Sequence, residues 1–258
     1  MIVSIDAYNQ HSEGAKLLAK ELDCYIIKHR NSRYRDRPNK VVINWGNTGR
    51  NWINTINRCE HVQRATNKLE FFRWVGDEIN VPPWTTDHDI AQQWIADGRT
   101  VVCRTLLSAH EGRGIVIADR NTPLVRAPLF TQYVPKRAEF RVHVVGNRSI
   151  LVQRKVRKAG LDQEANFGNR DARFKIRNTA NGFVFQRNNI NPPQAVIDEA
   201  VDAVRLCELD FGAVDVIWNE RQQKAYVLEV NTAPGIEGST VKDYAAALKE
   251  LADAKFMG

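Results

Sequence analysis

The 258-residue sequence lacks the patterns of several common protein classes. No apolar run is long enough to span a bilayer, and the first six residues have neither the basic region nor the apolar core of a signal peptide. Cysteine is scarce and forms no CxxC pair, which argues against a zinc module and a disulfide framework; the four cysteines are Cys24, Cys59, Cys103 and Cys207. These absences predict a protein of the reducing cytoplasm.

Several catalytic motifs are absent as well. The sequence contains no GxxxxGK[ST], no GxGxxG after a predicted strand, no HExxH and no GxSxG, and its six histidines show no metal-ligand spacing. P-loop and Rossmann enzymes, zinc hydrolases and serine hydrolases are therefore disfavoured.

The composition is that of a globular protein with an anionic partner. Hydrophobic residues make up 43% and charged residues 26%, and the length suits one large domain or two or three small lobes. The net charge of +7 favours nucleotide phosphates, an acidic peptide, nucleic acid or an acidic metabolite, without choosing among them. Arginine is concentrated in residues 28–37 and 137–187.

Periodicity predicts a mixed α/β chain. Short apolar strands at 2–5, 25–27 and 41–44 surround a helix capped by Ser12 and running through Leu22. The turn-rich segment 44–49 follows the third strand, and it is either a ligand-binding edge or a plain loop. Further helices are predicted from a Thr66 cap to about Ile79, and from a Thr86 capping box to Asp97, with Gly98 as the terminator.

The most informative segments are 211–218 and 227–235, which alternate with period two and predict an antiparallel hairpin. Glu229 and Asn231 share one face, and Asp215 lies opposite them in the expected register. Two close carboxylates repel, so a hard cation bound by oxygen ligands would stabilise them, and Mg²⁺ suits such a set. The alternative is a polar strand pair facing solvent; the combination of residues favours the metal.

A phosphate site is predicted upstream. Gly112 and Gly114 allow a loop to fold over phosphates, Arg104 on the preceding strand could pair with one bidentately, and Lys68 lies in a first helical turn. Taken alone, the two glycines fit an ordinary hairpin turn better.

The order of these motifs resembles that of the ATP-grasp ligases. The motifs occur along the chain in the same order as in that family. They are Asn67-Lys68, Val81-Pro-Pro83, the cationic strand and glycine loop, residues 129–135, Glu139-Phe-Arg141 and finally Asp215 with Glu229-x-Asn231. The closing segment 228–240 is most similar to the ribosomal-protein glutamate ligases, and more distantly to D-alanine–D-alanine ligases. The resemblance covers roughly residues 64–245.

The resemblance implies an α+β / α/β ATP-grasp fold, with two lobes enclosing the nucleotide. A small N-terminal α/β unit would span 1–63, the central lobe 64–131, and the C-terminal lobe with the metal site 132–258. A long segment, 159–175, is an insertion relative to the family.

The resemblance also implies residue roles. Lys68 would contact ATP phosphates, Glu139 would hold the ribose hydroxyls, and one or two Mg²⁺, with Mn²⁺ as an alternative ion, would bind Asp215, Glu229 and Asn231. The adenine slot would be lined by Gln132, Tyr133 and Val134. The family usually has lysine where this sequence has Arg104, so the charge is kept and the geometry changes.

The implied reaction joins a carboxylate to an amine through an acyl phosphate. Arg104 with Lys68 would neutralise charge during phosphoryl transfer, and Arg177 and Asn178 would stabilise the tetrahedral oxyanion. The substrates would be small-molecule or peptide carboxylates and amines, acidic in character. The candidate substrate contacts are Arg154, Arg157, Gly235, Ser239 and Thr240. The alternative is that the two arginines belong to a solvated basic strand edge and the other three residues to a loop and a helix cap.

Two other functions stay open at this point. One is a noncatalytic ATP-binding module of the same fold. The other is a nucleic-acid-binding or modifying protein that uses its basic surface, with aromatics such as Tyr34, Trp45 and Trp52 stacking on bases. The sequence fixes neither the substrates nor the oligomeric state.

Overall fold

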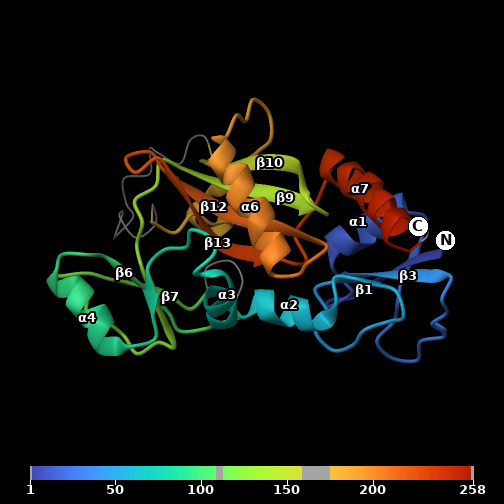
Figure 1. Cartoon of the computed structure of the whole chain (residues 1–258), viewed down its shortest axis with the longest axis horizontal. Coiled ribbons are helices and arrows are strands. Elements are labelled where there is room, and N and C mark those ends of the chain that lie inside the picture. The colour runs from blue at the N-terminus through green and yellow to red at the C-terminus, as the bar shows by residue number, and fades with distance from the viewer. Residues whose placement is uncertain (1, 109–112, 159–174, 257–258) are drawn as a thin grey trace.

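A computed structural model describes residues 2–108, 113–158 and 175–256 of the chain. Over these residues the chain forms six α-helices and three β-sheets, so the predicted mixed α/β class is confirmed. Figure 1 shows the first sheet beside both termini, the largest sheet in the middle and the third sheet at the far end. No helix in the described ranges has the length and apolarity needed to cross a membrane.

The N-terminal sheet is parallel, with strand order β2-β1-β3-β4. Its strands are β1 (Ile2–Ala7), β2 (Tyr25–Ile26), β3 (Lys40–Trp45) and β4 (Thr55–Ile56). Helix α1 (Glu13–Glu21) begins at Ser12, whose side chain accepts from the Ala15 N–H, so the predicted cap is confirmed. Helix α7 (Ser239–Phe256) packs against α1, and the C-terminus thereby completes the core of this unit.

The helix predicted from a Thr66 cap to about Ile79 is present as α3 (Lys68–Val75), but its cap is Asn67 and it ends at Val75. A helix that was not predicted, α2 (Cys59–Thr66), precedes it, and the two are separated at Asn67, whose backbone is extended. The Asn67 side chain accepts from the N–H groups of Leu69 and Glu70, and this cap ends one helix and begins the next. Lys68 therefore lies at the first position of α3, as the phosphate-site prediction requires.

The third sheet has the order β5-β8-β6-β7 and belongs to the central part of the chain. Its strands are β5 (Trp84–Thr85), β6 (Val101–Arg104), β7 (Ile115–Ala118) and β8 (Leu129–Gln132), and α4 (His88–Ala96) packs on it. The N-cap of α4 is Asp87 and not the predicted Thr86, because the Asp87 carboxylate accepts from two N–H groups of the first turn. Gly98 adopts the predicted positive φ.

The largest sheet is antiparallel, with order β11-β10-β9-β12-β13. It contains β9 (Ala138–Val145), β10 (Arg148–Arg157), β11 (Phe183–Gln186), β12 (Phe211–Asn219) and β13 (Lys224–Asn231). The hairpin predicted from residues 211–218 and 227–235 is present as β12 and β13, and α6 (Gln194–Leu206) covers one face of the sheet. The proposed domain boundaries stay a prediction; α2 runs across the one at residues 63 and 64.

His143 lies buried in β9 and joins this sheet to α7. Its Nδ1 is 3.0 Å from the Tyr244 hydroxyl and its Nε2 is 3.1 Å from Gln153 Oε1. A neutral imidazole fits both partners, since Nε2–H donates to the amide oxygen and Nδ1 accepts from the hydroxyl. Burial lowers the pKa of His143 to about 4.

We expect His143 to destabilise the fold at acid pH. The unfolded chain takes up this proton near pH 6.5 and the folded chain only near pH 4, so stability is lost as the pH falls between these values, by about 3 kcal/mol for this group. In His143→Gln this part of the pH dependence should vanish. Urea unfolding of both proteins between pH 7.5 and 4 measures the difference, and parallel curves would contradict the expectation.

Candidate functional site

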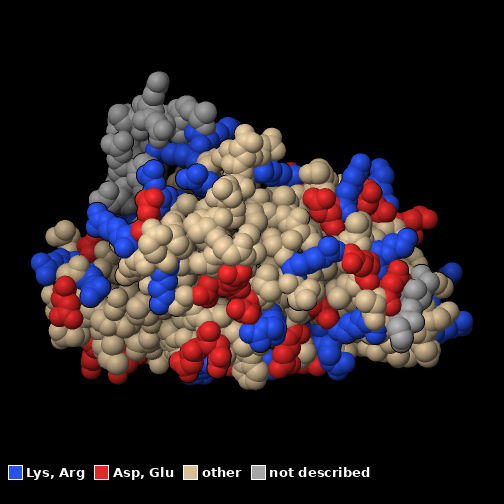
Figure 2. Space-filling model, turned by 45° about the horizontal axis from the view of Figure 1, so that its top comes forward, with Lys and Arg blue, Asp and Glu red and all other residues tan. Residues whose placement is uncertain are grey.

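A cavity of about 650 Å³ lies among the three sheets. It is lined by residues of every strand from β6 to β13, by the end of α2 and the start of α3, and by Tyr8, Glu13, Gly14 and Gly46 of the N-terminal unit. Among the described residues that line it, basic side chains outnumber acidic ones by eight to five; the basic ones are Lys68, Arg104, Lys136, Arg141, Lys155, Lys175, Arg177 and Arg187. Figure 2 shows Lys and Arg gathered in the upper left of one face, with mixed charges elsewhere. The cavity is suited to an anion.

The three predicted metal ligands meet at the wall of this cavity. Asp215 in β12 pairs directly with Glu229 in β13, and Ala213 pairs with Asn231, so the expected register is present. A β-bulge follows Asp215, after which Val216 pairs with Val227. The Asn231 amide nitrogen donates to the Ala213 carbonyl at 3.2 Å, which fixes the amide and leaves its oxygen as an acceptor.

Asp215 is held by two cations that lie outside the predicted set. Arg141 in β9 donates to both carboxylate oxygens, at 2.7 and 3.0 Å, and Lys155 in β10 donates to Oδ2 at 2.9 Å. The Asp215 side chain is only 5% exposed, and burial alone would raise its pKa. The charges of Arg141 and Lys155 outweigh burial and hold the pKa of Asp215 well below its ordinary value, so the carboxylate is ionised.

The same charge network extends to Glu139. Lys155 donates to one Glu139 oxygen at 2.6 Å and Lys136 lies 2.7 Å from the other. Burial would raise the pKa of Glu139, but the charges of Lys155 and Lys136 lower it below its ordinary value. Cations and carboxylates therefore alternate from Lys136 through Glu139, Lys155 and Asp215 to Arg141, and Lys155 touches both carboxylates.

Arg104, at the end of β6, and Lys68, at the start of α3, also reach the site. Lys68 Nζ lies 3.3 Å from a Glu229 oxygen. Arg104 is buried, and its Nε has no hydrogen-bond partner among the described residues. Burial lowers the pKa of Arg104, and the nearby Glu229 charge offsets only part of that effect. A buried guanidinium in this state favours the arrival of an anion.

Most of the other predicted residues line the cavity too: Gln132, Tyr133, Val134, Glu139, Arg177, Asn178 and Gly235. Arg177 Nε is buried without a hydrogen-bond partner in the described part of the chain. Asn178 caps the 3-10 helix η2 (Thr179–Asn181), its Oδ1 accepting from the Asn181 N–H at 2.8 Å.

Five predicted residues lie elsewhere. Arg154 and Arg157 are in β10 but are not among the cavity-lining residues, whereas Lys155 between them is. Ser239 and Thr240 form the start of α7, outside the lining. Gly114 has φ of +73° before β7, where a Cβ would meet Leu106 at 2.8 Å. Gly112 and residues 159–174 of the predicted insertion lie outside the described residues.

Sequence reasoning did not predict that Lys136, Arg141 and Lys155 pair with the site's carboxylates, nor that the N-terminal unit lines the cavity. Arg141 lies two positions after Glu139, so period two places both on one face, whereas Lys155 falls on the opposite face of its strand from Arg154. Gly46 has φ of +80°, and a Cβ there would meet Ala233 at 2.8 Å. This close approach brings the loop after β3 against the loop after β13 and carries Tyr8 to the cavity.

Comparisons with known proteins bear on the fold. No protein-family model and no curated protein sequence matches this chain. Among solved structures, the ATP-grasp ligase PsnB complexed with a minimal precursor, Mg and ADP has a TM-score of 0.66 at 13% identity, covering 97% of both chains. D-alanine–D-alanine ligase from Bacillus anthracis has a TM-score of 0.67 at 13% identity, covering 99% of this chain and 97% of its own.

A third solved structure, a RimK-domain ATP-grasp protein from Sphaerobacter thermophilus, has a TM-score of 0.61 at 12% identity and covers 97% of this chain and 99% of its own. At such identities the likeness shows the fold alone.

Proposed function

We propose, from the ATP-grasp fold that this chain adopts, that it is an ATP-dependent ligase that joins a carboxylate to an amine. The observation that carries the proposal is the meeting of Asp215, Glu229 and Asn231 at the wall of a basic cavity. PsnB, whose structure contains a precursor, Mg and ADP, and D-alanine–D-alanine ligase support the same reaction type for this fold.

The residues fit one or two magnesium ions. Two carboxylates and an amide oxygen are hard oxygen ligands, and Glu229, 29% exposed at its side chain, faces the cavity. Asp215 is kept ionised by Arg141 and Lys155, so a cation would find it deprotonated. When bound, magnesium would neutralise phosphate charge and orient the oxygens of the transferred group.

ATP would extend from these ligands to β8. The phosphates would meet Arg104 and Lys68, whose positive charges face Glu229 across the cavity. The base would lie along Gln132, Tyr133 and Val134, and the ribose hydroxyls would reach Glu139. Glu139 accepts from Lys155 and lies against Lys136, so both cations would fix its orientation for this purpose.

The chain's own groups account for the chemistry that follows. Phosphoryl transfer to a substrate carboxylate needs alignment and charge neutralisation, which Lys68 and Arg104 supply. Attack of an amine on the resulting acyl phosphate creates an oxyanion, and Arg177, with its unpartnered Nε in the cavity wall, is placed to donate to it. No side chain needs to form a covalent bond. We extend the substrate class to amino acids and acidic peptides.

Replacement of Arg104 should weaken nucleotide binding while it increases the stability of the fold. Arg104→Met removes a buried cation with an unpartnered Nε, so the free energy of unfolding should rise by about 1–2 kcal/mol. Affinity for Mg–ATP should fall roughly ten- to hundredfold, because a charge-assisted contact is lost. Calorimetric titration and thermal unfolding test both effects, with the exposed Arg99→Met, shortly before the same strand, as control. Unchanged ATP affinity would remove Arg104 from the site.

Turnover itself is tested by screening amino acids and acidic peptides for Mg-dependent ADP release, with mass spectrometry to find the amide product. We expect at least one carboxylate–amine pair to give stoichiometric ADP and product. ATP binding with no ADP release across the whole screen would contradict the proposal and favour a noncatalytic ATP-binding module.

A further inference from the structure

A basic segment of the N-terminal unit lies outside the proposed active site. Residues 28–40, here called the basic strap, lead from β2 into the first residue of β3 and contain four arginines, two lysines and one aspartate. Burial alternates residue by residue from 31 to 37, as along an extended chain, so Arg33, Arg35 and Arg37 are exposed while Tyr34 and Asp36 turn inward. None of the three arginines forms an ion pair with a described residue.

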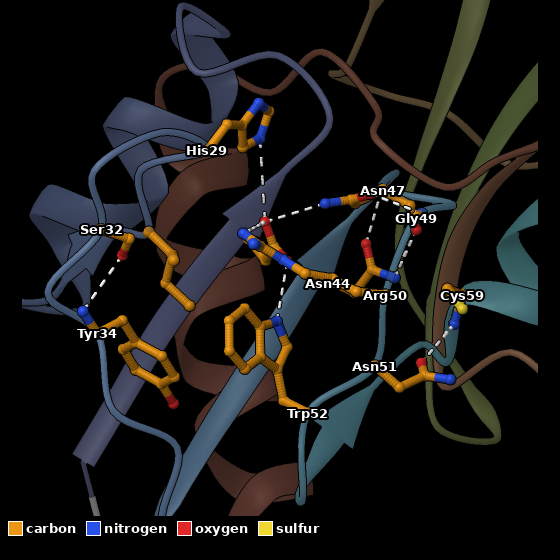
Figure 3. Close-up of polar contacts among 12 residues, drawn as sticks. His29, Ser32, Tyr34, Asn44, Asn47, Gly49, Arg50, Asn51, Trp52 and Cys59 are labelled. Carbon is orange, nitrogen blue, oxygen red and sulfur yellow. Dashed lines mark hydrogen bonds and ion pairs between the residues drawn. The ribbon is translucent and has the colours of Figure 1, made fainter.

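The inner side of the basic strap is anchored. Tyr34 lies edge-on against Trp52 (Figure 3), with ring centroids 4.8 Å apart. The Lys40 ammonium lies over the Tyr34 ring, 4.6 Å from its centroid. The Asp36 carboxylate accepts from the Ile53 N–H at 2.7 Å. The backbone is thus held by its inward side chains, and the three outward arginines are not needed for packing.

The basic strap begins beside the cavity. His29 Nε2 lies 2.7 Å from the Ala7 carbonyl, at the end of β1, and the next residue, Tyr8, lines the cavity. A chain that leaves the cavity past Tyr8 therefore reaches the basic strap directly.

We infer that the basic strap docks an acidic polypeptide segment of the substrate, an inference that rests on the proposed ligase function. Alternate residues of an extended peptide lie about 6.5–7 Å apart, the same repeat as the outward arginines, so acidic side chains at every second position can pair with Arg33, Arg35 and Arg37 in turn. Nucleic acid is disfavoured because Tyr34 and Trp52 pack edge to face against each other, and Lys40 and Arg50 already lie over the Tyr34 and Trp52 rings, respectively.

The test is binding of a fluorescently labelled Glu–Ser repeat peptide, followed by anisotropy without nucleotide. The strap variant is Arg33→Gln/Arg35→Gln/Arg37→Gln. The control, Arg99→Gln/Arg221→Gln/Lys249→Gln, removes the same charge from exposed positions outside the basic strap. We expect the Kd to rise about tenfold in the strap variant at low salt, as for the loss of three exposed ion pairs, and less than twofold in the control.

Equal weakening in both variants would overturn the inference, since it would reflect net charge alone. So would a larger loss for a labelled oligouridylate, or for phosphatidylserine vesicles, than for the Glu–Ser peptide. Arg33→Lys/Arg35→Lys/Arg37→Lys should keep most of the affinity, and unchanged thermal unfolding excludes misfolding.

The ligase reaction is followed separately. With a glutamate-rich substrate that turns over, the strap variant should show a raised KM and a retained kcat, and a KM equal to that of the unmodified protein would overturn the inference. If no substrate turns over while Mg–ATP binds, the ligase proposal fails, and anisotropy still decides whether the basic strap binds acidic peptide.

Discussion

Glu229→Gln should abolish Mg-dependent ADP release, with a loss of roughly 10³-fold or more in kcat/KM. Glu229 is the half-exposed carboxylate of the proposed metal site and the cross-strand partner of Asp215. The amide keeps the size of the side chain and one acceptor oxygen, but it removes the charge that would balance the cation. Steady-state ADP release against Mg²⁺ concentration measures the effect.

The expected loss is large because the remaining ligands cannot replace Glu229. Asp215 already accepts from Arg141 and Lys155, and Asn231 is neutral. In the variant, Lys68 and Arg104 lose the negative charge of Glu229, so metal-free nucleotide should bind at least as well as before. If the variant still binds ATP but its ATP affinity no longer depends on Mg²⁺, the replacement has therefore removed the metal site and not disrupted the fold.

Glu220→Gln is the matched control. Glu220 lies in the turn of the same hairpin and is exposed, and among the described residues its carboxylate forms one ion pair, a 3.6 Å contact with Arg137. It should leave activity and stability unchanged within experimental error. If Glu229→Gln kept more than half of the ADP release of the unmodified protein, the proposed metal site would be wrong.

The local sequence pattern could predict those parts of the site that a single hairpin brings together. Asp215 and Glu229 are 14 residues apart, and alternation along two adjacent strands is enough to place them on one face. Arg141 and Asp215 are 74 residues apart and meet only because β9 pairs with β12. That pairing joins elements separated by β10, β11 and α6, and neither strand's own sequence specifies it.

Errors in the fold prediction have similarly local causes. Thr66 and Asn67 are both acceptable helix caps, and the apolar pattern that continues to residue 79 does not reveal that α3 already ends at Val75. Strands β4 and β5 have two residues each, too few for any periodicity to register. The contribution of Tyr8 and Gly46 to the cavity depends on contacts with the loop after β13, which no local pattern reports.

Lys155→Met should be the most destabilising replacement in the site, lowering the free energy of unfolding by about 3–5 kcal/mol. Lys155 is 11% exposed at its side chain and contacts Glu139 at 2.6 Å and Asp215 at 2.9 Å. Methionine fills the same volume but leaves each carboxylate with one partner fewer in a buried setting. Arg154→Met, the next residue and exposed, should cost less than about 0.5 kcal/mol.

A double-mutant cycle separates the charge pairing from the loss of packing. In Lys155→Met/Glu139→Gln the carboxylate that would be left underpaired is also neutralised, so part of the lost stability should return and the two changes should be non-additive by at least about 1 kcal/mol. Urea unfolding of the four proteins supplies the coupling free energy. If the two changes in unfolding free energy were strictly additive, the ion pair with Lys136 would be enough to stabilise the Glu139 carboxylate. Lys155 would then stabilise the fold only through its contact with Asp215.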